Sequence, residues 1–386
     1  MAERVALTGN DSAAYALKQI NPDVVAAYPI TPQTEMMHKF AEYVANGEVD
    51  TEFIRVESEH SALSAVLGAS LAGARTASAT SSAGMALMWE MLYVTASCRA
   101  PVVMALVNRA LSGPINIHCD HSDSMGARDS GWIQIYAENC QEAYDNMLQA
   151  VRIAEHPDVM LPVMAALDGF ILSHTLEGLE VNDDDVARKF VGEYAPKHSL
   201  LNVDNPETFG SFALPNYYFE FKKQQVDAME NARRVILEVG KEYGELTGRA
   251  YGHLDPYLCD DAEVVIVGLG STMGTAKEAA DQVRAEDGIK AGVLKVRTFR
   301  PFPGEEIRKA LGRARVVGVM DRAISFGLGG PLYHEVRSHC YGAQAPLVNF
   351  IYGLGGRDLK LEDVRDSFRT LAGTKQSGVQ YIGVRE

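Results

Sequence analysis

Short apolar runs alternate with helical stretches over residues 1–170, and this alternation constrains the fold more than any other feature of the chain. Strands are expected at 24–28, 52–56, 76–80, 102–108 and 160–166, and helices at 35–45, 60–72, 84–95 and 140–155. Strands separated by helices form a mostly parallel sheet with helices on both faces, so the pattern predicts a doubly wound α/β domain. Polar motifs follow the strand ends at Tyr28, Val56, Thr80 and Asn108, where parallel sheets bind ligands.

The alternation breaks off between about residues 175 and 255. A stretch rich in Asn, Pro and aromatic residues at 202–221 indicates an irregular excursion, and residues 222–244 have the pattern of one long amphipathic helix. A second α/β unit follows, with expected strands at 264–267, 292–295 and 316–320 and expected helices at 273–286 and 305–312. We therefore expect two domains, residues 1–245 with the connector at their end, and residues 256–386.

The charge of the chain limits the partners that it can bind. Its 386 residues carry 51 acidic and 36 basic side chains, so neither nucleic acid nor an anionic membrane is an expected partner. A small anionic substrate needs only one local positive group and is not excluded. No apolar run approaches the roughly 20 residues of a membrane helix, and the amino-terminal segment lacks an apolar signal core. We expect a soluble, cytoplasmic protein.

The five cysteines, at positions 98, 119, 140, 259 and 340, include no Cys-x-x-Cys pair. This scatter disfavours an iron–sulfur cluster or structural zinc held by this chain alone. His118 and His121 lie near several aspartates, but their spacing matches no defined ligand pattern. We therefore assign no metal to this chain.

The segment Tyr28-Pro29-Ile30-Thr31-Pro32 follows the first expected strand. The rings of Pro29 and Pro32 fix their own φ angles, and each proline also restricts the backbone of the residue before it. The Thr31 hydroxyl would therefore be held in a defined direction. A plain turn that ends a strand is the alternative interpretation.

Two carboxylates, Glu57 and Glu59, stand between a strand and a helix of small residues. Ser58 or Glu59 at this helix start is a good capping pattern, and solvated capping groups are one interpretation. The functional interpretation needs one carboxylate in an apolar pocket, where it could share a proton with a ring nitrogen.

Arg109 follows the strand that ends at Asn108. An arginine there can hold a substrate carboxylate by two parallel N–H bonds. An internal ion pair with Asp120, Asp123 or Asp129 is an equally open alternative.

A glycine turn, Gly268-Leu269-Gly270-Ser271-Thr272-Met273-Gly274, opens a helix after a strand, as dinucleotide-binding turns do. Its third glycine is one place late, and no clear strand-end acid follows about 20 residues on. Tight packing of strand against helix is the simpler interpretation.

Taken together, these segments resemble the α subunit of the 2-oxoacid:ferredoxin oxidoreductases, thiamine-diphosphate enzymes that convert a 2-oxoacid and coenzyme A to an acyl-CoA and carbon dioxide. The motifs run in order along nearly the whole chain: YPITP at 28–32, VESEHSA at 56–62, TSSAGMALM at 80–88, NRALSGPIN at 108–116, RDSGWIQIYAEN at 128–139, FRPFP at 299–303 and GLGGRD at 353–358. The resemblance implies a pyrimidine-binding-type doubly wound domain followed by a transketolase C-terminal-like α/β domain.

The resemblance also implies roles for single residues. Glu59 would be the catalytic residue, in contact with the N1′ nitrogen of the cofactor's aminopyrimidine. Thr31 and Arg109 would bind the substrate carboxylate. The cofactor-binding residues would be Tyr28, Pro29, Ile30 and Glu59.

The family's diphosphate site lies outside this sequence. Such enzymes hold the diphosphate through Mg²⁺ on a Gly-Asp-Gly segment, and this chain contains none. The resemblance therefore implies a β subunit that supplies the Mg²⁺ and diphosphate site, a ferredoxin-like subunit with [4Fe-4S] clusters, and a γ subunit, with coenzyme A as a further partner.

The identity of the substrate is the least constrained inference. Pyruvate is the first choice on the family's prevalence, and an aromatic or branched 2-oxoacid such as phenylglyoxylate or 2-oxoisovalerate is the alternative. Two other classes stay open: a nicotinamide dehydrogenase that uses the Gly268 turn, and a non-catalytic scaffold subunit.

Overall fold

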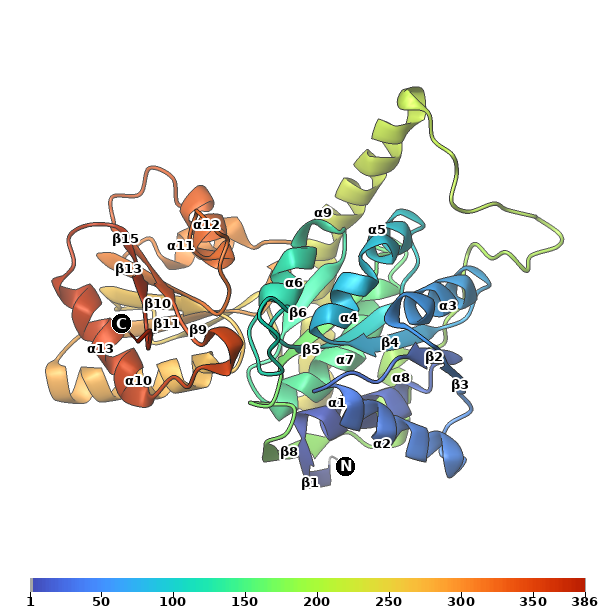
Figure 1. Ribbon diagram of the computed structural model, residues 1–386, viewed down its shortest axis with the longest axis horizontal. Helices are drawn as coiled ribbons and strands as arrows, with labels where there is room; N and C mark the ends of the chain where they lie inside the picture. The colour runs from blue at the N-terminus through green and yellow to red at the C-terminus, as the bar shows by residue number, and fades with distance from the viewer. Residues whose placement is uncertain (1–2, 386) are drawn as a thin grey trace.

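The computed structural model describes residues 3–385 and contains two mostly parallel sheets that lie side by side (Figure 1). The first sheet has the strand order β12-β6-β7-β5-β4-β2-β3, and only β12 is antiparallel to its neighbour. Its strands are β2 (Val24–Ala27), β3 (Glu52–Arg55), β4 (Thr76–Thr80), β5 (Val103–Asn108), β6 (Ile133–Tyr136), β7 (Val163–Asp168) and β12 (Thr298–Arg300). The predicted doubly wound α/β fold is confirmed.

Helices cover both faces of this sheet. On one face, α1 (Gly9–Ile20), α2 (Thr34–Ala45) and α7 (Cys140–Ala154) bury their apolar sides in one cluster with the strands. On the other face lie α3 (Glu59–Leu71), α4 (Ser82–Leu87) and α5 (Trp89–Ser97). Because the strands are buried on both faces, β4, β5, β6 and β7 are buried along their whole length.

The expected helix at 84–95 is two helices. The chain breaks at Met88, which ends α4 and begins α5. The sequence between them contains neither Gly nor Pro, so no local signal marks the break.

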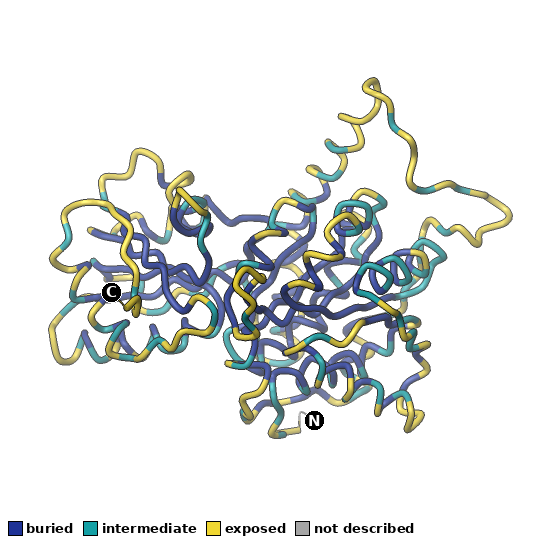
Figure 2. The backbone as a smooth tube through the Cα atoms, in the orientation of Figure 1, coloured by how far each residue is buried: buried dark blue, intermediate teal, exposed yellow. Residues whose placement is uncertain are grey.

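The connector between the sheets is more ordered than the sequence suggests. Strand β8 (Leu176–Val181) returns to pair with β1 (Glu3–Thr8) in a small antiparallel sheet, and α8 (Asp184–Val191) follows. After an irregular stretch comes α9 (Pro215–Thr247), longer than the expected 222–244 because Pro215 fits its first turn and Gly248 closes it in a left-handed conformation. The amino-terminal part of α9 projects from the body and is exposed (Figures 1 and 2).

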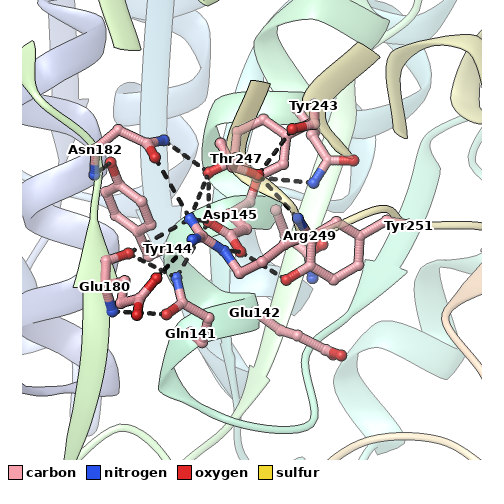
Figure 3. Close-up of polar contacts among 12 residues, drawn as sticks. Gln141, Glu142, Tyr144, Asp145, Glu180, Asn182, Tyr243, Thr247, Arg249 and Tyr251 are labelled. Carbon is pink, nitrogen blue, oxygen red and sulfur yellow. Dashed lines mark hydrogen bonds and ion pairs between the residues drawn. The ribbon is translucent and has the colours of Figure 1, made fainter. Parts of the chain in front are cut away.

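A buried carboxylate fastens the carboxyl end of α9 to the first domain (Figure 3). Asp145 on α7 accepts hydrogen bonds from the hydroxyls of Tyr243 and Tyr251. It also pairs with Arg249, whose Nε lies 2.8 Å from Oδ2. The Asn182 side chain completes the cluster by donating to the Tyr243 hydroxyl over 2.8 Å. Burial, followed by the nearby Asp145 carboxylate, raises the pKa of Tyr243 and Tyr251.

The second sheet has the order β15-β14-β13-β10-β11-β9. Its strands are β9 (Leu254–Tyr257), β10 (Val264–Gly268), β11 (Ala291–Val296), β13 (Val316–Asp321), β14 (Leu347–Ile351) and β15 (Gly378–Tyr381). Helices α10 (Thr272–Asp287) and α13 (Leu361–Gly373) pack on one face, and α11 (Gly304–Ala310) and α12 (Pro331–His339) on the other.

The two sheets share structure at their junction. The segment 297–303 looks like a loop in the sequence, but its residues Thr298–Arg300 form β12, which pairs with β6 of the first sheet. That partner lies far earlier in the chain, so no local pattern reveals the pairing. Beside it, Lys295 is buried and lies 2.5 Å from Glu142 on α7. The second sheet is therefore attached to the first by the strand pairing of β12 with β6 and by the ion pair of Lys295 with Glu142.

None of the helices within residues 3–385 is both long and apolar enough to cross a membrane. The cytoplasmic location stays a prediction.

Candidate active site

The predicted site residues follow neighbouring strands at one edge of the first sheet. In the order β5-β4-β2-β3, the strand ends lead into Arg109, the start of α4 at Ser81–Gly84, the Tyr28–Pro32 turn and Glu59. The connection from β2 runs outward to β3, and that from β4 runs the other way to β5. The boundary between β2 and β4 is therefore a topological switch point, where ligands bind in such sheets.

Two buried amides hold the Tyr28–Pro32 turn in place. The Gln33 side chain donates to the Ala79 carbonyl of β4 over 3.0 Å, and Asn10 donates to the Pro32 carbonyl over 2.8 Å. Thr31 itself is exposed. The turn is thus anchored from behind while the Thr31 side chain remains accessible.

The structure brings Arg109 to this turn. Arg109 is 7 % exposed, and its Nη1 donates to the Thr31 carbonyl over 2.9 Å. Its Nε donates to the Asn116 carbonyl over 2.8 Å. Within residues 3–385, Nη2 has no acceptor and the guanidinium has no carboxylate within ion-pair distance. Burial lowers the pKa of Arg109, and nearby Asp123 acts in the opposite direction.

Asp123 joins the ends of β4 and β5. Its Oδ2 accepts from the main-chain N–H of Ser82 at 3.0 Å and of Arg109 at 2.9 Å. Its Oδ1 accepts from the Asn108 side chain at 2.8 Å and from the Ser124 N–H at 2.7 Å. Burial raises the pKa of Asp123 to about 6, although these four donors act to lower it. Asp123 is therefore an internal acceptor for the site's backbone, and its contact with Arg109 is through the main chain.

Glu59 differs from its capping neighbours. Ser58 is the N-cap of α3 and accepts from the Ser61 N–H, while Glu57 is exposed and accepts from the Ser61 hydroxyl. Glu59 is 6 % exposed, and none of the described residues donates a hydrogen bond to its carboxylate. The capping function thus belongs to Ser58, and the Glu59 carboxylate has its acceptor capacity free.

Gly84 lets this carboxylate lie close to the end of β4. A Cβ on Gly84 would lie 2.7 Å from Glu59 Oε1 and would also collide with the Thr80 hydroxyl. The hydroxyls of Thr80 and Ser81 are buried and have no hydrogen-bond partner in the described structure. This edge of the sheet thus holds unsatisfied hydroxyls near a carboxylate with free acceptor capacity.

Several exposed apolar side chains, called the apolar rim below, come from the same segments as these polar groups. Large side chains from the turn, from helices α4 and α5 after β4, and from the loop after β5 are exposed: Tyr28, Leu87, Trp89, Leu111, Ile115 and Ile117. Ile115 is the most exposed of these six side chains, with 80 % of its surface accessible. Exposed apolar groups gathered around a site are typical of a surface that contacts another molecule.

The glycine turn of the second domain is occupied by a carboxylate of the first. Ser271, at the start of α10, donates to Asp168 through its N–H at 3.1 Å and its hydroxyl at 2.5 Å. Gly270 has φ of +76°, and a Cβ there would lie 3.0 Å from the Asp168 oxygens. The helix terminus that would hold a dinucleotide phosphate is already filled, which disfavours the dehydrogenase alternative.

Cys119, His121 and Asp168 converge nearby, with their ligand-type atoms within 4.8 Å of one another. The side chain of one arginine contacts two of them. Arg322 Nη1 lies 3.0 Å from Asp168 Oδ2 and 3.7 Å from the Cys119 sulfur. His121 and Arg322 hold the pKa of Asp168 low, against the raising effect of burial. The cluster is best described as a buried ion-pair network between the two domains.

Sequence reasoning named Asp123 only as a possible ion-pair partner of Arg109, and it missed Gln33 and Asn116. Gln33 reaches the Ala79 carbonyl, and Asn116 reaches the Gly355 carbonyl, both far away in the sequence. A single sequence does not separate such a supporting amide from a surface residue.

The family comparisons match most of the chain. Residues 15–241 match the model described as pyruvate flavodoxin/ferredoxin oxidoreductase, thiamine diphosphate-binding. Residues 262–364 match the model described as pyruvate:ferredoxin oxidoreductase core domain II.

Full-length relatives agree with these models. Pyruvate synthase subunit PorA of Thermotoga maritima is 54% identical over 100% of this chain and 99% of its own length. The Methanocaldococcus jannaschii subunit of the same name is 46% identical over 100% and 99%. Ketoisovalerate oxidoreductase subunit VorA of Pyrococcus abyssi is 45% identical over 93% of this chain and 91% of its own.

Solved structures agree at the level of the fold. A 2-oxoglutarate:ferredoxin oxidoreductase from Magnetococcus marinus superposes with a TM-score of 0.73 at 20% identity, covering 95% of this chain and 65% of that one. A split-gene transketolase superposes with a TM-score of 0.57 at 14% identity, covering 95% and 98%.

Proposed function

Because the chain belongs to the pyruvate flavodoxin/ferredoxin oxidoreductase family, we propose that it is the α subunit of a complex that oxidatively decarboxylates pyruvate with coenzyme A to an acyl-CoA and carbon dioxide. The single observation that carries the proposal is the Glu59 carboxylate, buried at the switch point and without a donor among the described residues. Such a group is suited to receive a hydrogen bond or a proton from a bound ring.

The residues at this edge fit thiamine diphosphate. When bound, this cofactor supplies a carbon nucleophile and a ring that accepts electrons, which is the chemistry that a 2-oxoacid decarboxylation needs. Glu59 would hold the proton exchanged at the pyrimidine nitrogen N1′, beside the unpartnered hydroxyls of Thr80 and Ser81. Tyr28, Pro29 and Ile30 would lie against the pyrimidine.

Thr31 and Arg109 would bind the substrate carboxylate. The Thr31 carbonyl and the Asn116 carbonyl already orient the guanidinium, and Nη2 still has its N–H groups to donate. A carboxylate bound there would be held beside the accessible Thr31 side chain, which orients the neighbouring ketone.

The remaining half of the site would come from partner subunits. The chain lacks a Gly-Asp-Gly segment, so a β subunit would hold Mg²⁺ and the diphosphate, and the apolar rim supports such a contact. The dispersed cysteines support placing the [4Fe-4S] clusters in a ferredoxin-like subunit. A γ subunit would complete the complex. Residues 1–245 would form the pyrimidine-binding domain and residues 256–386 the second domain.

Pyruvate is the substrate that the relatives favour, because several PorA subunits match this chain over its full length. The VorA relative, at 45% identity, keeps a branched substrate such as 2-oxoisovalerate as the second candidate. An aromatic acid such as phenylglyoxylate stays a further candidate.

The test is the native complex, purified with its partners and assayed on a panel of 2-oxoacids with coenzyme A and a low-potential dye. Glu59→Gln should lower kcat by roughly 10²-fold or more, because Gln cannot hold the exchanged proton. Glu57→Gln, which changes an exposed carboxylate of the same segment, is the matched control and should keep normal turnover. Unchanged turnover in both variants would instead support a scaffold subunit.

A further inference from the structure

The loop that carries Arg109 rests on the second domain. Residues 109–121 leave β5 and run along the loop at 353–357, which includes the short helix η2 (Leu354–Gly356). Three hydrogen bonds join the two loops. The Asn116 side chain donates to the Gly355 carbonyl at 3.0 Å, the Gly355 N–H donates to Asp120 at 3.2 Å, and the Gly356 N–H donates to the Cys119 carbonyl at 2.7 Å.

Asn116 connects this contact to the guanidinium. While its side chain donates to Gly355, its main-chain carbonyl accepts from Arg109 Nε at 2.8 Å. Its side-chain oxygen also accepts from the His118 N–H at 2.6 Å, so Asn116 cannot turn without breaking several contacts. The position of Asn116, and through it the direction of the guanidinium, depends on the second domain.

The glycines of this loop are required by both backbone and space. Gly355 and Gly356 have φ of +59° and +79°, in the left-handed region that favours glycine. A Cβ on Gly355 would lie 2.7 Å from Asn116 Nδ2, and a Cβ on Gly356 would collide with the His118 side chain. Any larger residue would push the Arg109 loop away.

From these contacts we propose that the loop Gly353–Arg357 of the second domain is a positioning element for the substrate, which acts through Asn116 on Arg109. The inference rests on the proposed binding of the substrate carboxylate by Arg109. The loop touches no reacting atom in this scheme. It sets the direction in which the N–H groups of Arg109 face the carboxylate, and so the affinity for the 2-oxoacid.

The experiment compares matched glycine variants in the assembled complex. Gly356→Ala and Asn116→Ala should each raise the KM for pyruvate roughly tenfold while kcat stays within about threefold, because a displaced guanidinium weakens ground-state binding. Gly342→Ala is the control. Gly342 has φ of +84° in the same domain, but a Cβ there meets nothing within 4 Å. It carries the same backbone penalty without touching the loop, and its KM should be normal.

Arg109→Gln, measured in parallel, separates the two hypotheses. If Arg109→Gln raises the KM and the two loop variants do so too, the positioning role is supported. If Arg109→Gln raises the KM but the loop variants match Gly342→Ala, substrate binding by Arg109 stands and the inference is overturned. If Arg109→Gln leaves the KM unchanged, the binding of the substrate carboxylate by Arg109 and the positioning inference are both overturned, while the proposed function is still tested by Glu59→Gln. Asn116→Ala keeps the test decisive should Gly356→Ala fail to assemble.

Discussion

At the scale of single residues, Asp123 shows how a group that touches no ligand can govern a site. Its carboxylate accepts from the backbone of both strand ends that carry site residues, at Ser82 and Arg109. With a proton on one oxygen, it could no longer accept from all four of its donors. The state of one buried proton therefore controls how firmly the edge of the sheet is held.

This leads to a pH prediction. Burial raises the pKa of Asp123 to about 6, above its ordinary 3.8, so the folded protein protonates it as the pH falls through 6 while the unfolded chain does so only near 3.8. Protonation of Asp123 therefore favours the folded state: its contribution to the free energy of unfolding is full below pH 3.8 and is lost as the pH rises through about 6. Acid thus loosens the hydrogen bonds that Asp123 accepts but does not unfold the domain through this group. The KM for pyruvate should rise below about pH 6.

Steady-state kinetics between pH 5 and 8 check this. Asp123→Asn should show a raised KM throughout and no inflection near 6, since an amide presents N–H groups to the same donors. Asp129→Asn, which changes an exposed carboxylate in the neighbouring segment, should keep the normal profile. An Asp123→Asn profile identical to that of the unchanged protein would contradict the role.

At the scale of elements, the sequence predicts those features that depend on residues close together in the chain. Strand β4 occupies the predicted 76–80, and the strand-end motifs lie along one edge, because apolar period and turn residues are local signals. Strand β12, by contrast, depends on its pairing with β6, and Gln33 depends on the Ala79 carbonyl. Such long-range contacts leave no local pattern, so the supporting residues of the site came only from the structure.

The attachment of helix α9 gives a prediction at the same scale. Asp145→Ala would remove the buried partner of Arg249, which would keep only the exposed Glu180 as an ion-pair partner, and would remove the acceptor of two tyrosine hydroxyls. We expect a cost on the order of 3 kcal/mol, visible as a lower midpoint of thermal unfolding. Asp158→Ala breaks an exposed pair with Arg234 near the same helix and should cost no more than about 0.5 kcal/mol. Equal midpoints for both variants would refute the anchoring role.

At the scale of the whole molecule, buried ion pairs join the two domains. Lys295 comes from β11 and is buried against Glu142 and Glu138 on the first domain, at 2.5 and 2.9 Å. Burial alone would lower the pKa of Lys295, but the two carboxylates outweigh it and hold that pKa above its ordinary value. With β12 and the loop at 353–357, this contact fixes how the second domain meets the Arg109 loop.

A double-variant comparison tests this junction. Lys295→Met should cost about 3 kcal/mol or more, because it leaves Glu142 buried without its cation. Adding Glu142→Gln removes the stranded charge while keeping the acceptor that the Glu138 N–H uses, so the double variant should recover part of the loss. The KM for pyruvate should follow the same order, with the larger increase in Lys295→Met and the smaller increase in the double variant, since a loosened junction shifts the loop under Arg109. If the double variant were less stable than Lys295→Met alone, the two charges would not be acting as a pair, and the junction would owe its rigidity to β12 and apolar packing.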